Sequence, residues 1–297
     1  MWESLYPALD WETSQSTWPH HNFSRFVQTP GQRWHVQIAG NGPTLLLLHG
    51  TGASTHSWRD LVPVLSRHFT VVCPDLPGHA FSASQGSRGL SLESITAGLG
   101  DLLDTLGQWP AAIVGHSAGA AIAAQLVLGN SARPTPCVIG LNPAWLPLPG
   151  LANWLFPPTA KLMALNPWSA RWLSRQAAKP GMVRRLIEGT GSRLDESGIA
   201  LYQRLLEAPA HVNGVLNMMA SWQLDGLARR LPRLCGPVFM QVGANDLAVP
   251  GVLAQQACAL MPHAELVSLA GLGHLAHEED PAGACELILE WVNRRGG

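Results

Sequence analysis

The residues that decide the fold are Gly115-His116-Ser117-Ala118-Gly119, which follow an apolar run at 111–114 and precede a helix-prone segment at 120–126. A serine in a G-x-S-x-G pentapeptide between a strand and a helix is typical of a nucleophile elbow, a tight turn that lifts the hydroxyl above the sheet. The alternative is an ordinary serine in a glycine-rich turn, but such a turn requires neither the preceding strand nor the following helix. The pentapeptide therefore predicts Ser117 as a nucleophile and the amide of Ala118 as an oxyanion donor.

Other apolar runs end at the residues that a serine hydrolase needs. The run at 43–48 ends at His49-Gly50-Thr51-Gly52, where the amide of Thr51 is expected to be the second oxyanion donor. The run at 237–243 is followed by Asp246, and the run at 264–270 by a glycine-rich turn and His274. The order serine, aspartate, histidine is the order of the α/β-hydrolase triad.

Two of these assignments have alternatives. Asp246 is also well placed to cap a helix that begins near residue 250, a common duty of aspartate. His277 competes with His274 for the role of the base. His274 is preferred because it directly follows the strand-ending glycine, where a loop can carry the imidazole to the serine. His277 is then expected to orient that loop.

The alternation of strand and helix predicts an α/β fold with a mainly parallel, doubly covered sheet. The alternation stops between Asn142 and residue 237. We therefore expect a hydrolase core formed by residues 1–144 and 234–297, and an inserted helical cap formed by residues 145–233. The expected elements are a hairpin at 24–40, strands near 44–48, 69–74, 111–115, 137–141, 237–242 and 264–269, and helices near 57–67, 91–107, 118–129, 250–261 and 281–293.

The chain resembles the α/β-hydrolase superfamily from about residue 24 to its end. Residues 75–79, Asp-Leu-Pro-Gly-His, are similar to the D-x-P-G-x-G turn of that superfamily, although Ala80 stands where its second glycine usually lies. If the turn needs a positive φ there, the alanine costs about 1 kcal/mol. The serine at position 117 disfavours dehalogenase and epoxide-hydrolase chemistry, which the resemblance associates with an aspartate at the elbow.

Within the superfamily, the chain is similar to the magnesium-chelatase accessory family of bacteriochlorophyll biosynthesis. The resemblance is carried by the stretches at 33–37, 49–60, 115–121, 188–194 and 271–279. It implies a role in photosynthetic tetrapyrrole synthesis, near the insertion of Mg²⁺ into protoporphyrin IX, with magnesium-chelatase subunits as partners. Two functions follow: a serine hydrolase acting on a tetrapyrrole-related ester, acid or thioester, or a non-catalytic porphyrin-binding or chelatase-docking protein with a vestigial triad.

The predicted cap is rich in aromatic and basic residues. It carries eleven basic and five acidic side chains, a net charge of +6, while the rest of the chain carries −7. An apolar chamber edged by arginine suits a flat ligand with carboxylates, such as a porphyrin, and equally an anionic acyl chain or an anionic membrane surface. An ordinary cap core with a solvated charged face is the alternative. The expected pocket residues are His49, His116, Trp145, Trp154, Arg184, Arg185, Met218 and Trp222.

Composition limits the partners. Charged residues make up 13% of the chain, against about 25% in an average domain, which suggests a face hidden against a membrane, a partner or another copy. A net charge of −1 gives no general attraction to nucleic acid. Five cysteines without a C-x-x-C pair indicate buried thiols and a cytoplasmic location, peripheral to the membrane at most. Prolines throughout 134–160 argue against a membrane-spanning helix there, no secretory leader is seen, and no metal or cofactor is expected.

Overall fold

The computed structural model of the chain describes residues 6, 8–83, 89–148, 161–166, 168–261 and 263–295. Its centre is an eight-stranded sheet with the order β1-β2-β4-β3-β5-β6-β7-β8. Strand β2 is antiparallel to both of its neighbours and the other pairs are parallel. The strands are β1 (Ser24–Thr29), β2 (Gln32–Ala39), β3 (Thr44–Leu48), β4 (Thr70–Pro74), β5 (Ala112–His116), β6 (Cys137–Leu141), β7 (Val238–Gly243) and β8 (Ala264–Leu269).

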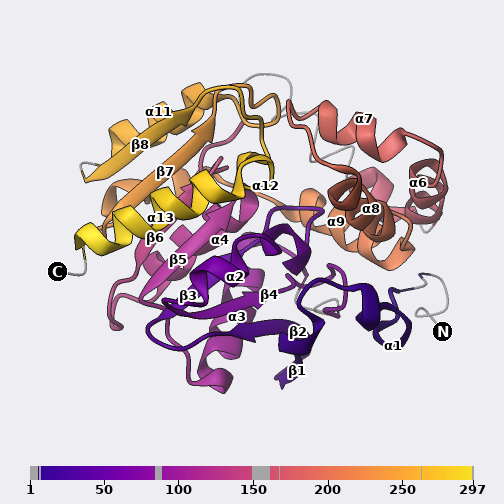
Figure 1. The fold of residues 1–297 in the computed structure, drawn as a ribbon, viewed down its shortest axis with the longest axis horizontal. Helices are drawn as coiled ribbons and strands as arrows, with labels where there is room; N and C mark the ends of the chain where they lie inside the picture. Colours follow the sequence, from indigo (N-terminus) through magenta and orange to yellow (C-terminus); the bar gives the residue numbers. More distant parts are fainter. Residues whose placement is uncertain are drawn as a thin grey trace.

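Helices cover both faces of this sheet, as Figure 1 shows. Because successive strand side chains point to opposite faces, Leu46 and Leu48 pack toward one layer and Leu45 and Leu47 toward the other. The first layer contains α3 (Leu92–Leu106), α4 (Ala118–Gly129) and α11 (Gly251–Leu260). The second contains α2 (Val62–Leu65) and α13 (Pro281–Arg295). Burial on both faces explains the uninterrupted apolar runs of the central strands.

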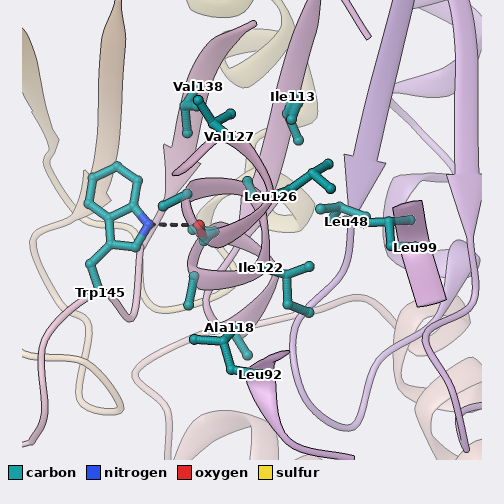
Figure 2. Close-up of a cluster of buried hydrophobic side chains, with 14 of the residues drawn as sticks. Leu48, Leu92, Leu99, Ile113, Ala118, Ile122, Leu126, Val127, Val138 and Trp145 are labelled. Carbon is teal, nitrogen blue, oxygen red and sulfur yellow. Dashed lines mark hydrogen bonds between the residues drawn. The ribbon is translucent and has the colours of Figure 1, made fainter. Parts of the chain in front are cut away.

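The centre of the first layer is α4, the helix that Ser117 precedes. Nine of its twelve residues are buried, because it lies between the sheet and α3. Figure 2 shows its side chains packed against those of Leu48, Leu99 and Ile113. The indole nitrogen of Trp145 donates a 2.7 Å hydrogen bond to the carbonyl of Ala120. The base of the nucleophile turn is therefore fixed on all sides by core residues.

The cap helices α6 (Ser169–Ala177), α7 (Met182–Glu188), α8 (Glu196–Leu206) and α9 (Pro209–Ser221) gather at one end of the molecule (Figure 1). Leu224, Leu227 and Leu231 pack instead in the same cluster as α4, so the packing of the core extends inside the expected cap limits. The shorter elements are α1 (Trp11–Ser14), η2 (Gln15–Thr17), η3 (His21–Phe23), η4 (Thr55–Trp58), α10 (Asp225–Ala228), η6 (Leu231–Arg233) and α12 (Ala276–Glu279).

The predicted α/β fold is confirmed, and most expected elements lie within two residues of their observed bounds. The helix expected at 57–67 is wrong. The chain forms the short helices η4 and α2 there, because Pro63 has no N–H to donate to a preceding turn. Ala80 adopts a φ of +42°, so the turn does require the left-handed region at this position.

The five cysteines are free thiols. Cys73 and Cys285 are buried as expected, but Cys235 is exposed, which corrects the expectation that all five are buried. Within the described ranges, no helix has both the length and the low polarity needed to cross a bilayer.

Candidate active site

Ser117 lies in a strained turn between β5 and α4. Its φ of +51° and ψ of −114° are unusual for a residue with a side chain, and such strain is typical of nucleophile elbows. Every other residue from Ala112 to Ala124 is buried, whereas Ser117 is partly exposed. A Cβ on Gly119 would lie 2.1 Å from the carbonyl oxygen of Leu48, so only glycine permits this approach. The turn therefore presents a single reactive side chain.

The loop after β3 lies against this turn. A Cβ on Gly50 would come within 3.2 Å of the Cβ of Ser117, so the two backbones are in contact. The amides of Thr51 and Ala118 donate no hydrogen bond to another described residue. The Ala118 amide is among the first of α4, where the helix leaves its N–H groups unpaired. The two amides predicted as oxyanion donors are thus near Ser117 and unoccupied by the described part of the chain.

His274 and Asp246 form a buried pair. The Nδ1 of His274 lies 2.8 Å from the Oδ2 of Asp246. The same oxygen accepts a 2.7 Å hydrogen bond from the side-chain nitrogen Nδ2 of Asn142. Oδ1 accepts bonds from the amides of Ala248 and Val249, each at 2.8 Å. The carboxylate therefore orients His274 and closes the turn at 246–249, but it does not cap α11, whose N-cap is Pro250 and has no side-chain cap bond. Because Nδ1–H donates to the carboxylate, Nε2 remains the basic nitrogen.

Asn142 is a site residue that the sequence analysis missed. It follows β6 with a φ of +46°, a conformation that asparagine tolerates better than most residues. Its position at the end of a central strand, directly before the interruption of the strand and helix alternation, is the signal that could have identified it.

Two neighbouring histidines hold the loop that carries His274. The Nε2–H of His116 donates to the backbone carbonyl of His274 at 2.9 Å, and their rings lie 4.8 Å apart. Burial holds the pKa of His116 well below its usual value, so its ring stays neutral. His277 is bonded to Ser57 at 2.9 Å rather than to the aspartate, and burial lowers its pKa to about 3. His277 therefore forms no pair with Asp246 in the described structure, and its orienting role stays a prediction.

His49 lies beneath the loop that contains Thr51. Its Nε2 accepts the amide of Leu76 at 2.9 Å, and its Nδ1–H donates to the carbonyl of Gly50 at 2.8 Å. Burial lowers its pKa, so this neutral tautomer persists. His49 thus fixes the loop to the turn after β4 and has no free nitrogen for a ligand.

A cap segment, residues 189–193, lies between the aspartate loop and the histidine loop. The carbonyl of Thr190 accepts the amides of Leu247 at 3.1 Å and His274 at 3.4 Å. The hydroxyl of Ser192 accepts the amide of Leu275 at 2.7 Å. Gly191 has a φ of +85°, and a Cβ there would lie 1.9 Å from the carbonyl oxygen of Asn245. The cap therefore holds both loops through the carbonyl of Thr190, the close approach of Gly191 and the hydroxyl of Ser192. In the sequence, this role is visible only as a stretch that carries the family resemblance.

We expect Ser192→Ala to lower the free energy of unfolding by about 1–3 kcal/mol, because the buried amide of Leu275 loses its acceptor. Urea titration measures this change. Ser197→Ala is the matched control, since that serine is exposed and bonds only to Asp195. Equal stability of the two variants would contradict a structural role for the Ser192 hydroxyl.

The remaining expected pocket residues lie in different surroundings. Met218 is close to the site, because its sulfur accepts the Thr51 hydroxyl at 3.7 Å. Trp145 and Trp222 pack on the core cluster around α4. Arg184 and Arg185 lie outward on α7, because Val183 and Ile187 are its buried residues, and Arg184 forms an ion pair with Glu196. Trp154 lies outside the described residues.

In the ranges that the structure describes, no three histidine, cysteine, aspartate or glutamate side chains are grouped in a way that would hold a metal ion.

Comparison with known proteins places this geometry in context. A model of the Alpha/beta hydrolase family matches residues 45–287. The chain is 39% identical over 286 residues to the magnesium-chelatase 30 kDa subunit of Rhodobacter capsulatus, covering 96% of this chain and 99% of that protein. It is 26% identical to haloalkane dehalogenase 2 of Mycobacterium tuberculosis, with 95% and 99% covered. The solved structure of the ligand-free epoxide hydrolase CorEH has a TM-score of 0.75 at 23% identity, with 90% and 97% covered.

Proposed function

Because this chain belongs to the alpha/beta hydrolase family, we propose that it is a serine hydrolase that cleaves an ester-like or related carbonyl bond. The observation that carries the proposal is the strained, partly exposed Ser117 at the start of α4, together with the buried pair of His274 and Asp246. A serine at the elbow supports acyl transfer rather than the chemistry named for the dehalogenase and epoxide hydrolase relatives.

In the proposed reaction, His274 takes the proton of the Ser117 hydroxyl on Nε2 while the oxygen attacks the substrate carbonyl. The amides of Thr51 and Ala118 stabilise the oxyanion. The leaving group takes the proton from Nε2, and an acyl ester on Ser117 remains. Water, activated by His274, then releases the acid and restores the serine. Asp246 holds the tautomer and stabilises the imidazolium that forms in each half of the cycle.

We expect a fluorophosphonate probe to label the native protein, and Ser117→Ala to abolish both labelling and the hydrolysis of short p-nitrophenyl esters. The probe reacts only with an activated serine, so loss of the nucleophile removes the signal. Circular dichroism should show an unchanged fold, and Ser197→Ala should label like the native protein. Full labelling of His274→Ala together with loss in His277→Ala would overturn the histidine assignment.

The substrate class is proposed from the relative that is 39% identical, which is named as a subunit of magnesium chelatase. We propose a tetrapyrrole-related substrate near the chelatase step of bacteriochlorophyll synthesis, chelatase subunits as partners, and a cytoplasmic location with peripheral membrane contact through the positively charged cap. Protoporphyrin IX should then inhibit labelling of Ser117 in a saturable manner.

A non-catalytic accessory protein is the second candidate. The observation that favours it is the name of the same relative, which describes a subunit and not a hydrolase. If this candidate is right, the native protein binds protoporphyrin IX, measured by tryptophan quenching, but is not labelled by the fluorophosphonate. Labelling that depends on Ser117 rejects it.

A further inference from the structure

The outer surface of the cap exposes large apolar side chains. Five of the eight large apolar residues exposed in the described part of the chain lie between positions 161 and 188. They are Leu162, Leu165, Trp168, Trp172 and Leu186, with exposed fractions of 71%, 73%, 64%, 56% and 52%. Tryptophan is costly to leave in water, and monomeric proteins rarely gather such side chains without a function.

The helical spacing of α6 separates this surface from the cap interior. Ala170, Leu173, Ser174 and Ala177 face inward, where Ala170 and Leu173 pack with residues of α9. Trp168, Trp172 and Arg175 recur every three or four positions on the opposite side and are exposed. Figure 1 shows α6 at the end of the cap away from the sheet, with α7 along the top of the cap. The outer side of α6 and its ends thus carries Trp168, Trp172, Arg175 and Lys179 exposed and Arg171 half-buried, and Leu162 and Leu165 are exposed shortly before this helix. We call these residues the outer cap face.

Basic residues accompany the apolar ones. Residues 161–188 contain six basic side chains and one acidic side chain, Glu188. Arg184 is paired with Glu196, but Lys161, Arg175, Lys179 and Arg185 form no ion pair with any residue in the described ranges. The guanidinium of Arg171 lies 6.0 Å from the ring of Trp168. The positive charge of this region is thus largely uncompensated and interleaved with tryptophan.

We propose that the outer cap face binds the surface of an anionic lipid bilayer, with its tryptophans and leucines at the acyl boundary and its arginines and lysines at the lipid phosphates. Interfacial helices combine these residue types in this way. A second copy of the chain is a poorer occupant, because two such faces would bring like charges together. The proposal deepens the peripheral contact of the proposed function, but it does not require Ser117 to be catalytic.

Vesicle flotation tests this proposal on the full chain. We expect the protein to float with vesicles of phosphatidylcholine and phosphatidylglycerol at 7:3, and far less with phosphatidylcholine alone. Trp168→Ala/Trp172→Ala should lower the partition coefficient at least tenfold. Arg175→Gln/Lys179→Gln should lower it by roughly thirtyfold, since each lost charge costs about fivefold. Binding should weaken in 0.5 M NaCl, and tryptophan emission should shift to the blue on binding.

The matched controls carry the same changes elsewhere. Leu247→Ala/Leu260→Ala removes exposed apolar side chains outside the cap face, and Arg229→Gln/Arg233→Gln removes two exposed charges, so both should float like the native protein. Equal binding to both vesicles, no flotation, or equal losses in the controls would overturn the proposal. So would binding to polyglutamate without binding to vesicles, which indicates an acidic protein partner. Ser117→Ala should float normally, so a failure here is distinct from a failure of the hydrolase proposal.

Discussion

The free energy of unfolding should fall by at least about 6 kcal/mol when the pH is lowered from 8 to 5. The cause is a group of buried, neutral histidines around the candidate site. Burial lowers the pKa of His56 and His277 to about 3 and that of His211 to about 4. At pH 5 each of these rings takes up a proton only in the unfolded chain, which favours unfolding by about 2 kcal/mol per ring.

The direction follows from the sign of these shifts. A histidine whose pKa is lowered in the folded state contributes its full stability above the unfolded value near 6.5, and this contribution is lost as the pH falls toward 3 or 4. Carboxylates such as Asp75 do not add to this loss of stability while the pH stays above about 4. Burial is the largest single influence on Asp75 and raises its pKa, but the interactions with His35, His49 and the amide of Thr55 together outweigh it and lower the pKa to about 2. The contribution of Asp75 is therefore lost only below about pH 4.

Urea titrations at pH 8, 6.5 and 5 measure this dependence. His211→Gln should reduce the slope of the unfolding free energy against pH by the equivalent of about one bound proton, whatever the stability of the variant at pH 8. His68→Gln should leave the slope unchanged, because that histidine is exposed. A native protein equally stable at pH 8 and pH 5 would mean that these rings are protonated without unfolding.

Local patterns were sufficient to predict the sheet and the order of the candidate triad. The apolar runs mark strands that are buried on both faces, and the ends of such strands place Ser117 and Asp246 at one edge of the sheet. The single helix expected at 57–67 is wrong because of Pro63, whose missing N–H outweighs an otherwise helical sequence.

Contacts between distant parts of the chain could not be predicted in this way. The cap segment at 189–193 reaches the loops of Asp246 and His274 through the carbonyl of Thr190, the close approach of Gly191 and one small hydroxyl, that of Ser192, which leave no distinctive side-chain pattern. The direction of Arg184 and Arg185 also depended on which side of α7 packs inward, and a short helix with two arginines does not determine this. The strands that carry the candidate triad could therefore be predicted from the sequence, whereas the residues that surround the triad could not.

Glu278→Gln should lower the free energy of unfolding by up to about 3–5 kcal/mol, the typical cost of removing one partner of a buried ion pair. The other carboxylate near Arg59, that of Asp60 at 3.3 Å from Nε, is half exposed and compensates the guanidinium only in part. The Oε2 of Glu278 accepts Nη1 of Arg59 at 2.7 Å, and Oε1 accepts the hydroxyls of Ser57 at 2.6 Å and Tyr202 at 2.7 Å. The Glu278 side chain is fully buried and that of Arg59 is 11% exposed. The glutamine amide is neutral and cannot compensate the guanidinium charge. Only one of its two terminal atoms, the oxygen, is an acceptor, so it cannot accept all three hydrogen bonds.

This carboxylate also connects the cap to the core, because Tyr202 comes from α8 while Ser57 and Arg59 lie in or beside η4. Burial raises the pKa of Tyr202 well above its usual value, so its hydroxyl remains a donor at any pH where the protein is folded. Tyr202→Phe removes one of three bonds to a charged acceptor and should cost about 1.5–3 kcal/mol, less than the loss of the charge itself.

Urea titration of Glu278→Gln against Glu196→Gln provides the decisive comparison. Both carboxylates pair with an arginine, but the Glu196 side chain is 89% exposed, so its loss should cost under about 1 kcal/mol. The double variant Glu278→Leu/Arg59→Leu should be more stable than Glu278→Leu alone, because it removes the unpaired charge together with its partner. If Glu278→Gln is no less stable than Glu196→Gln, water reaches Arg59 in solution, and the link between cap and core does not depend on this ion pair.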